Sequence, residues 1–393
     1  MKSDYNNAEI KVVNAFQAYI SKWFSNVCEK SYYFVCNHAV ELHNRVFITK
    51  EKIDTARNNR NGAYFTAHLF EYGMLKEITD FKPDIVVSTY IYCTIALNNI
   101  SLCYNLPCKT AGITLDYGVS PYWEYCADKI DYMFITNDAM TGDFLKRGFK
   151  DKQLIISGIP IAENFSCPDN KNVARAKLKL EDCFTITVMK ASFFHITEEK
   201  LVEQLYGIKG KCQVVLINGK DEKSRKKINK ELCRKKHKNH TDLILHNIGY
   251  TSDIVGYLSA SDLVICKAGG LSTTEIINTS VPALIIDRLP QQEIYNKKYL
   301  IDHNCAIAVN EHTIAATINS LIDDAEKLNH MRESSKKLRN PDALNIIVNK
   351  LYESPKADYS EWFFSDSKST VRRIINKKLS QIHKSAKEKS RNK

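Results

Sequence analysis

The chain has 393 residues, 44% of them hydrophobic, and a formal net charge of +11 at pH 7. This content allows two buried cores, but no run reaches the roughly 18 apolar residues of a membrane span, and the N-terminus is not a signal peptide. The twelve cysteines form no Cys-x-x-Cys pair, which predicts reduced thiols in an intracellular protein rather than disulfides or zinc ligands.

The first half of the chain alternates helical and strand-like segments. Residues 8–27 have the spacing of an amphipathic helix, and a proline turn leads into a short apolar strand over 82–89. Three further strand-like runs follow at 110–115, 132–136 and 154–156. Strands that alternate with helices predict a parallel, doubly wound sheet.

A second series of strands begins after Gly158-Ile159-Pro160. Its strand-like runs are at 184–188, 213–217, 243–245, 263–266 and 283–286. The lysine-rich segment 209–240 has glutamates among its lysines, which is typical of a solvated helix face rather than a nucleic-acid surface. The sequence therefore predicts an α/β protein with two similar halves.

The strand at 262–266 runs into an expected anion site. It ends in Lys267-Ala268-Gly269-Gly270-Leu271, and Ser272-Thr273-Thr274-Glu275 then opens a helix. Paired glycines let a backbone approach a ligand closely, and a helix N-terminus presents free N–H groups to a phosphate. The alternative is a capping box, in which Ser272 and Glu275 only satisfy the amides of the helix.

A longer block around this site resembles a known family. Residues 249–275, then Pro282 and 289–296, closely resemble the donor half of the monogalactosyldiacylglycerol synthase and processive diacylglycerol glucosyltransferase family. Residues 114–123 are similar to the family's Thr-Asp-aromatic and Pro-x-Trp segment, and Gly158-Ile159-Pro160 resembles its domain junction. The similarity extends over about residues 5–352.

The resemblance implies a GT-B fold, in which two Rossmann-like domains flank a cleft. Residues 1–160 would form the acceptor and membrane-side domain, and 161–339 the nucleotide-sugar domain, with a helix over 340–352 that can pack back on the first. The implied reaction is an inverting transfer from a UDP-sugar to a membrane lipid, with no metal and no cofactor beyond the donor substrate.

The resemblance also assigns site residues by position. Gly269, Gly270, Ser272 and Thr273 would contact phosphate, and Glu275 would bind the ribose hydroxyls. The sugar and its surroundings would be contacted by Gln292, Glu293 and Asn296. The expected donor-binding set is completed by Gly249, Lys267 and Leu271. Two carboxylates are candidates for the catalytic base, Glu9 and Asp116, although Asp116 could equally be a turn-forming residue after a strand.

Two glycine-rich loops of the family are altered in this chain. Tyr5 to Val12 stands where the family has a Gly-x-Gly-His loop, so Glu9 replaces the histidine and the first strand of the N-terminal domain is expected to be missing. Glu9 could act as a base only if burial raised its pKa. The second loop, 189–195, carries Phe193 and Phe194, which would crowd the cleft, while Lys190 could compensate by its charge.

The C-terminal tail, 356–393, holds most of the net charge. Ten Lys and Arg against one Glu fall within 367–393. Apolar residues at helical spacing follow Trp362-Phe363-Phe364, a pattern typical of a helix that lies on an anionic membrane surface. The alternatives are a solvated basic tail and one that contacts nucleic acid, which is not expected here.

Together these observations predict a glycosyltransferase that moves a hexose from a UDP-sugar to diacylglycerol or a related membrane lipid. We expect it in the cytoplasm, peripheral on the inner face of the cell membrane. Two alternatives stay open: a catalytically impaired paralogue that binds a nucleotide or a partner, and a transferase with a polyprenyl-linked acceptor.

Overall fold

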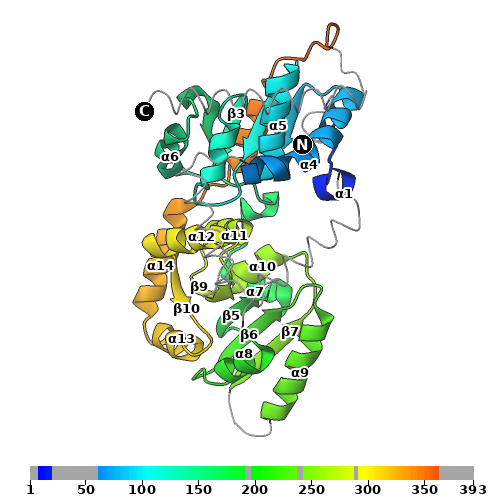
Figure 1. Cartoon of the computed structure of the whole chain (residues 1–393). Helices are drawn as coiled ribbons and strands as arrows, with labels where there is room; N and C mark the ends of the chain where they lie inside the picture. Colours follow the sequence, from blue (N-terminus) through cyan, green and yellow to red (C-terminus); the bar gives the residue numbers. More distant parts are fainter. Residues whose placement is uncertain (1–7, 20–60, 191–195, 237–241, 287–290, 363–393) are drawn as a thin grey trace.

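The structure, a computed structural model, describes residues 8–19, 61–190, 196–236, 242–286 and 291–362. The chain forms two α/β units, one above the other in Figure 1, and each is built on its own parallel sheet. We call them the first unit, with strands β1 to β4, and the second unit, with strands β5 to β10. Among the described residues, no helix combines the length and the apolar character needed to cross a membrane.

The first unit has a four-stranded parallel sheet in the order β1-β2-β3-β4. Its strands are β1 (Ile85–Ser88), β2 (Lys109–Ile113), β3 (Tyr132–Ile135) and β4 (Leu154–Ile156), which confirms the predicted strands to within three residues at each end. Its helices and 3-10 turns are α1 (Ala15–Tyr19), α4 (Asn61–Phe81), α5 (Ile91–Tyr104), η1 (Pro121–Cys126), η2 (Asp138–Met140), α6 (Thr141–Lys146) and η3 (Asp151–Gln153).

The predicted helix over 8–27 is wrong at its start. Residues 8–14 are not helical, and α1 begins only after Asn14, whose side chain accepts a hydrogen bond from the Gln17 amide at 3.3 Å. Val12 is 90% exposed, so the apolar spacing there has no core to pack against. Residues 20–27 lie outside the described residues. The first strand of the N-terminal domain was expected to be missing, and no strand precedes β1 in the described part of the chain.

The second unit has a six-stranded parallel sheet in the order β10-β9-β8-β5-β6-β7. The strands are β5 (Phe184–Met189), β6 (Cys212–Ile217), β7 (Leu243–Ile248), β8 (Leu263–Cys266), β9 (Ala283–Ile286) and β10 (Ala306–Val309). Five were predicted, and β10 was missed. The strand order reverses between β5 and β8. In open α/β sheets a ligand binds at such a switch point, outside the carboxyl ends of the strands.

Helices cover both faces of this sheet. Along β8, Leu263 and Ile265 join one buried apolar cluster and Val264 and Cys266 join another, as expected for a strand buried on both sides. The helices and 3-10 turn of this unit are η4 (Glu163–Phe165), α7 (Lys171–Leu178), α8 (Glu198–Leu205), α9 (Glu222–Lys236), α10 (Ile254–Ala260), α11 (Gly270–Thr279), α12 (Gln291–Asp302), α13 (Ile314–Ile322) and α14 (Ala325–Leu338).

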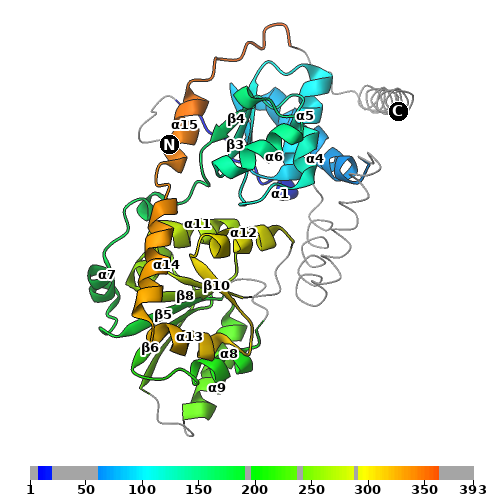
Figure 2. The same cartoon turned by 90° about the vertical axis from the view of Figure 1, so that its left-hand side faces the viewer.

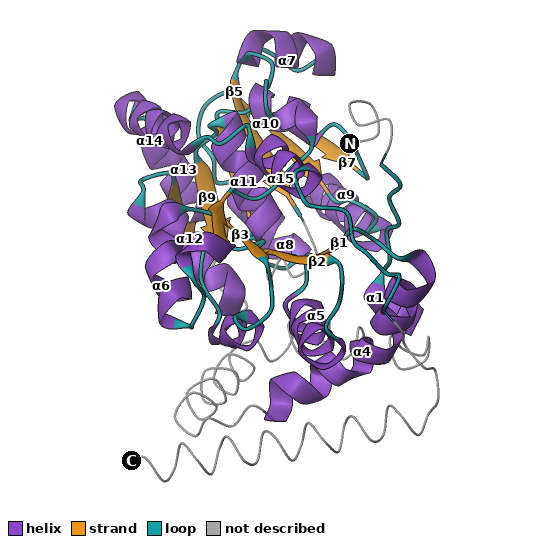
Figure 3. Cartoon of the chain, turned by 90° about the horizontal axis from the view of Figure 1, so that it is seen from above, coloured by secondary structure: helices purple, strands orange, loops and turns teal. Residues whose placement is uncertain are grey.

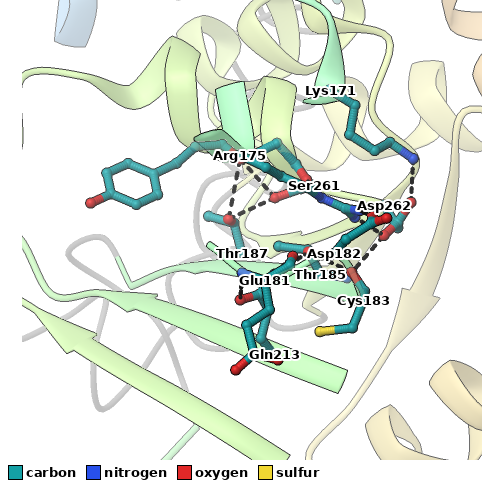
Figure 4. Close-up of polar contacts among 12 residues, drawn as sticks. Lys171, Arg175, Glu181, Asp182, Cys183, Thr185, Thr187, Gln213, Ser261 and Asp262 are labelled. Carbon is teal, nitrogen blue, oxygen red and sulfur yellow. Dashed lines mark hydrogen bonds and ion pairs between the residues drawn. The ribbon is translucent and has the colours of Figure 1, made fainter. Parts of the chain in front are cut away.

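A polar network fixes the start of β8, as Figure 4 shows. The Asp262 carboxylate pairs with Lys171 and, at 2.7 Å, with Arg175 of α7, and it accepts the Thr185 amide at 2.9 Å. The Asp262 side chain is only 15% exposed, so these partners replace the water that the charge has lost. The strand that leads to the paired glycines is thereby held at its origin.

The chain returns to the first unit along α14 and α15 (Ala343–Tyr352), which follow one another up one side of the molecule in Figure 2. Ile347 of α15 packs with Ile113 and Phe134 on one face of the first sheet. The two crossings between the units meet where the Asn340 amide donates to the Ser157 carbonyl at 2.9 Å.

Residues after α15 stay on the first unit. The Tyr359 hydroxyl donates to the Pro83 carbonyl at 2.8 Å, and the Trp362 indole N–H donates to the Tyr104 carbonyl at 3.0 Å. The basic amphipathic part of the predicted tail, from residue 363 onward, lies outside the described residues. The described chain therefore ends against α5, which is shown from above in Figure 3.

Candidate active site

The N-terminus of α11 lies at the switch point of the second sheet and faces the first unit (Figure 1). Gly269 is its N-cap residue and makes no side-chain cap, and Gly270 is the first helical residue. Ser272 is therefore the third helical residue, so the capping-box alternative is wrong. The first amides of a helix have no partner within the helix and carry its positive dipole end, so this helix start has the donors that the predicted anion site requires.

A loop of the first unit rests directly on this helix start. A Cβ atom placed on Gly270 would lie 1.7 Å from the Leu115 carbonyl oxygen and 3.3 Å from Asp116 Oδ1. Only glycine fits there, because the backbone of the first unit occupies the space of a side chain. The same close approach recurs at Gly118, where a Cβ would lie 2.4 Å from the Tyr295 side chain.

Asn296 joins the two units at this point. Its buried amide accepts the Tyr117 N–H at 2.7 Å and donates to Asp116 Oδ1 at 2.9 Å and to the Ala268 carbonyl at 3.0 Å. Beside it, the Tyr117 hydroxyl lies 3.0 Å from Thr274 Oγ1. The sequence placed Asn296 near the sugar, but it did not indicate this bridge or the part that Tyr117 plays in it.

The carboxylates at this junction have different surroundings. Burial raises the pKa of Asp116, and Glu293 adds to the rise, while the hydrogen bond from Asn296 and the charge of Lys267 oppose it. Glu293 forms an ion pair with Lys267 at 2.5 Å, and the two side chains are 14% and 17% exposed. Both lie 3.9 Å from the Cβ position of Gly269.

Glu275 lies further along α11, five residues after Gly270. Burial raises the pKa of its carboxyl from 4.5 to about 7. At neutral pH the carboxyl can therefore exist in both protonation states, and in either state it can accept a hydrogen bond from a hydroxyl group.

The remaining predicted site residues lie in four parts of the structure. Thr273 is buried and Ser272 half-buried at the start of α11, while Leu271 is 50% exposed. Gly249 follows β7, with the nearest side chain, that of Glu222 in α9, 3.2 Å from its Cβ position. Gln292 belongs to α12, but its side chain lies outside the described residues. Glu9 is exposed, and none of the contacts among the described residues joins it to Asp116 or α11.

Lys190, at the end of β5, is directed elsewhere. Its ammonium pairs with Glu198 at 2.6 Å and contacts Ser224, and its side chain is 9% exposed. Burial opposes ionisation of Glu198, but hydrogen bonds from Lys190 and Ser224 outweigh it and lower the pKa of Glu198 to about 2. The prediction that the charge of Lys190 compensates for the altered glycine-rich loop is therefore wrong, because this charge is paired with Glu198. Phe193 and Phe194 lie outside the described residues.

Two family models match the chain, one on each unit of the structure. A family model described as monogalactosyldiacylglycerol (MGDG) synthase matches residues 1–161, and one described as the glycosyltransferase family 28 C-terminal domain matches residues 190–347. Both halves of the chain thus match glycosyltransferase models, and the predicted resemblance to the monogalactosyldiacylglycerol synthase family is confirmed. The two matches correspond to the two units of the structure. The second match includes the whole of α11 and α12.

Two proteins similar to this chain are named processive diacylglycerol beta-glucosyltransferase. The protein of Bacillus licheniformis is 25% identical over 296 residues, which cover 75% of this chain and 73% of its own. That of Staphylococcus saprophyticus is 22% identical over 285 residues, with 70% and 69% coverage.

Solved structures share the fold. Acinetobacter baumannii MurG matches with a TM-score of 0.50 and 15% identity over 74% of this chain and 79% of its own. The Staphylococcus aureus MnaA–UDP co-structure matches with a TM-score of 0.54 and 15% identity over 76% and 85%. At this identity the likeness supports the fold alone, and this glycosyltransferase has the predicted GT-B fold.

Proposed function

We propose that this glycosyltransferase moves a hexose from a UDP-sugar to diacylglycerol or a closely related membrane lipid. The names of the relatives support this choice of acceptor. The observation that carries the proposal is the position of Asp116, a carboxylate with raised pKa held 3.3 Å from the Cβ position of Gly270. The candidate base is thus adjacent to the helix start that would bind the diphosphate, as transfer from a nucleotide sugar requires.

The donor would bind across the switch point of the second sheet. Its diphosphate would lie on the amides of Gly270, Leu271 and Ser272, where the helix dipole stabilises negative charge. Glu275 would accept hydrogen bonds from the ribose hydroxyl groups. The Lys267–Glu293 pair at Gly269 would lie next to the sugar, with Lys267 as the positive charge nearest to the phosphates.

The reaction proposed is a single displacement that inverts the anomeric carbon. The acceptor hydroxyl oxygen forms a bond to that carbon, and the bond from the carbon to the diphosphate oxygen breaks, so UDP leaves with the electron pair. Asp116 takes the hydroxyl proton. Charge that develops on the leaving diphosphate is stabilised by the start of α11, in the manner of an oxyanion hole and without need of a metal ion.

Burial suits Asp116 to this role, because a base is most effective when its pKa approaches the working pH. Asn296 would hold the carboxylate in place and keep one oxygen hydrogen-bonded. Glu9 is the weaker candidate, since it is exposed and makes no described contact with the site.

We further propose that the protein works in the cytoplasm at the inner face of the cell membrane. The basic part of the tail follows Trp362, whose indole N–H is hydrogen-bonded to the Tyr104 carbonyl of the first unit. A basic tail attached there would bring the unit that faces the acceptor to an anionic surface, at roughly 1 kcal/mol per basic residue.

The experiment is release of UDP from UDP-glucose and UDP-galactose in the presence of vesicles that contain diacylglycerol. Asp116→Asn keeps an oxygen for Asn296 but removes the base, so the turnover rate should fall about 10²–10⁴-fold with UDP binding retained. If wild type binds UDP and turns over neither donor with diacylglycerol or a polyprenyl phosphate, the protein is a binding paralogue. If only the polyprenyl phosphate supports turnover, the acceptor is polyprenyl-linked and not diacylglycerol.

A further inference from the structure

Lys267 and Glu293 form an ion pair beside the start of α11. Lys267 follows β8, Glu293 lies in the first turn of α12, and their charged atoms are 2.5 Å apart. A Cβ atom on Gly269, the N-cap of α11, would lie 3.9 Å from Lys267 Nζ and 3.9 Å from Glu293 Oε1. The pair therefore flanks the helix start to which the proposed function assigns the donor diphosphate.

This pair is held by fewer contacts than the ion pairs at the other end of the same strand. There the Asp262 carboxylate, 15% exposed, has two basic side chains and a backbone amide as partners (Figure 4). The Glu293 carboxylate is 14% exposed, yet Lys267 is its one partner in the part of the chain that the structure describes. An ion pair with a single contact separates more readily than a network, so Lys267 can leave Glu293 for a stronger acceptor.

The donor diphosphate would be such an acceptor, and this step rests on the proposed function. A diphosphate carries more negative charge than a carboxylate and has more oxygens that accept charge-assisted hydrogen bonds from an ammonium group. The ammonium of a lysine stands on a flexible four-carbon stem. Lys267 can therefore turn from the carboxylate to the phosphates while the backbone of β8 and α11 stays in place.

Separation of the pair would leave a carboxylate beside the reacting centre. Glu293 lies three residues before Asn296 in α12, so the two side chains share one face of the helix. Asn296 donates to Asp116, the proposed base. A carboxylate without its ion-pair partner is a strong acceptor, and the hydroxyl groups of the donor hexose are donors of the kind that it can bind.

We infer that Lys267 is a positioning residue that exchanges Glu293 for the donor diphosphate and so makes Glu293 available to the hexose. Without a diphosphate, a hexose must compete with Lys267 for this carboxylate. The nucleotide and the hexose of the donor would therefore bind cooperatively. The exchange thus favours a complete nucleotide sugar over a free hexose.

The test is calorimetric titration of the full-length protein with UDP, UDP-glucose and UDP-galactose. Glu293→Gln keeps the shape of the side chain but removes the charge that holds Lys267, so it should bind UDP about threefold tighter than wild type. The ratio of the affinity for the better UDP-hexose to the affinity for UDP should fall about fivefold in this variant. The reason is that a neutral amide replaces the charged acceptor of the hexose hydroxyl groups.

A double-mutant cycle with Lys267→Met isolates the exchange. In wild type the ammonium must leave Glu293 to reach the phosphates, whereas in Glu293→Gln it is already available. Lys267→Met should therefore weaken UDP binding about threefold in the wild-type background and about tenfold or more in the Glu293→Gln background. If Lys267→Met does not fold, the affinities of Glu293→Gln for UDP and the UDP-hexoses decide alone.

The matched control is Lys171→Met, which removes an ion pair with Asp262 at the other end of β8 and should bind UDP as wild type does. The exchange is overturned if Lys267→Met causes equal losses in the two backgrounds, or if Glu293→Gln binds UDP and the UDP-hexoses as wild type does. The proposed function fails separately, if wild type binds no UDP at millimolar concentration, and the exchange then fails with it.

Discussion

The start of α11 and the loop at Leu115 to Gly118 meet at the same place, but they are specified in different ways. The helix start follows from local sequence, since Gly269 and Gly270 interrupt an apolar strand and a helix begins there. The loop is held by Asn296, Thr274 and the Tyr299 ring, whose centroid is 4.4 Å from that of Tyr117. The helix start proposed to bind the diphosphate is thus specified locally, while the placement of the proposed base beside it depends on tertiary contacts.

Of the changes considered, removal of the Asn296 side chain should have the largest effect, because it removes the contacts that hold the loop on α11. Asn296→Ala would leave Asp116 Oδ1, the Tyr117 amide and the Ala268 carbonyl without their partner, at a cost of about 2–4 kcal/mol in stability. The pKa of Asp116 should rise further, because it loses a hydrogen bond that lowers it.

Urea unfolding of this variant measures the stability, and the pH profile of turnover measures the base. Asn172→Ala on the surface of α7 is the control and should change stability by less than about 0.5 kcal/mol. Equal unfolding midpoints for the two variants would show that the bridge does not hold the units together.

The paired glycines offer a matched comparison of the two regions. Gly270→Ala puts a methyl group against the Leu115 carbonyl, so the loop must move, with an expected loss of about 1–3 kcal/mol. Displacement of Asp116 by about 1 Å should also lower turnover about 10²-fold.

Gly269→Ala is the control for packing, because the nearest atoms to its Cβ position are 3.9 Å away. Its backbone, at φ −69° and ψ 149°, suits any residue. Thermal unfolding should therefore separate the two variants clearly. Similar melting temperatures would mean that the loop does not rest on α11 in solution.

A smaller effect is expected from the titration of Glu275. Its pKa of about 7 in the fold exceeds 4.5, so the folded state keeps a proton that the unfolded state has lost, and stability falls as pH rises from 4.5 to 7. Glu275→Gln lacks this dependence. The free energy of unfolding of Glu275→Gln, measured with urea, should therefore rise relative to that of wild type by about 1–2 kcal/mol between pH 5 and pH 8. A constant difference between the two proteins would contradict the burial of this carboxyl.

The sequence predicted features whose causes are local. The apolar runs predicted strands of both parallel sheets, and Gly269-Gly270 predicted the start of α11. The strand β10 was missed because two of its four residues, Ala306 and Ala308, have low strand propensity. The helix at 8–14 failed because apolar spacing without a core does not make a helix.

The contacts that complete the site could not be predicted in this way. Asn296 and Tyr117 are 179 residues apart in the chain, and nothing near either residue indicates the other. The diversion of Lys190 to Glu198 and Ser224 is also tertiary, because Ser224 belongs to α9. The resemblance supplied residue identities at the site, whereas the structure supplied their partners.

Calorimetric titration with UDP tests the central claim most directly. The site proposed here should bind UDP in the wild-type protein, and Glu275→Ala should weaken that binding about tenfold or more through loss of the ribose contact. Failure of the wild-type protein to bind UDP at millimolar concentration, or equal affinity in the two proteins, would contradict a donor site on α11.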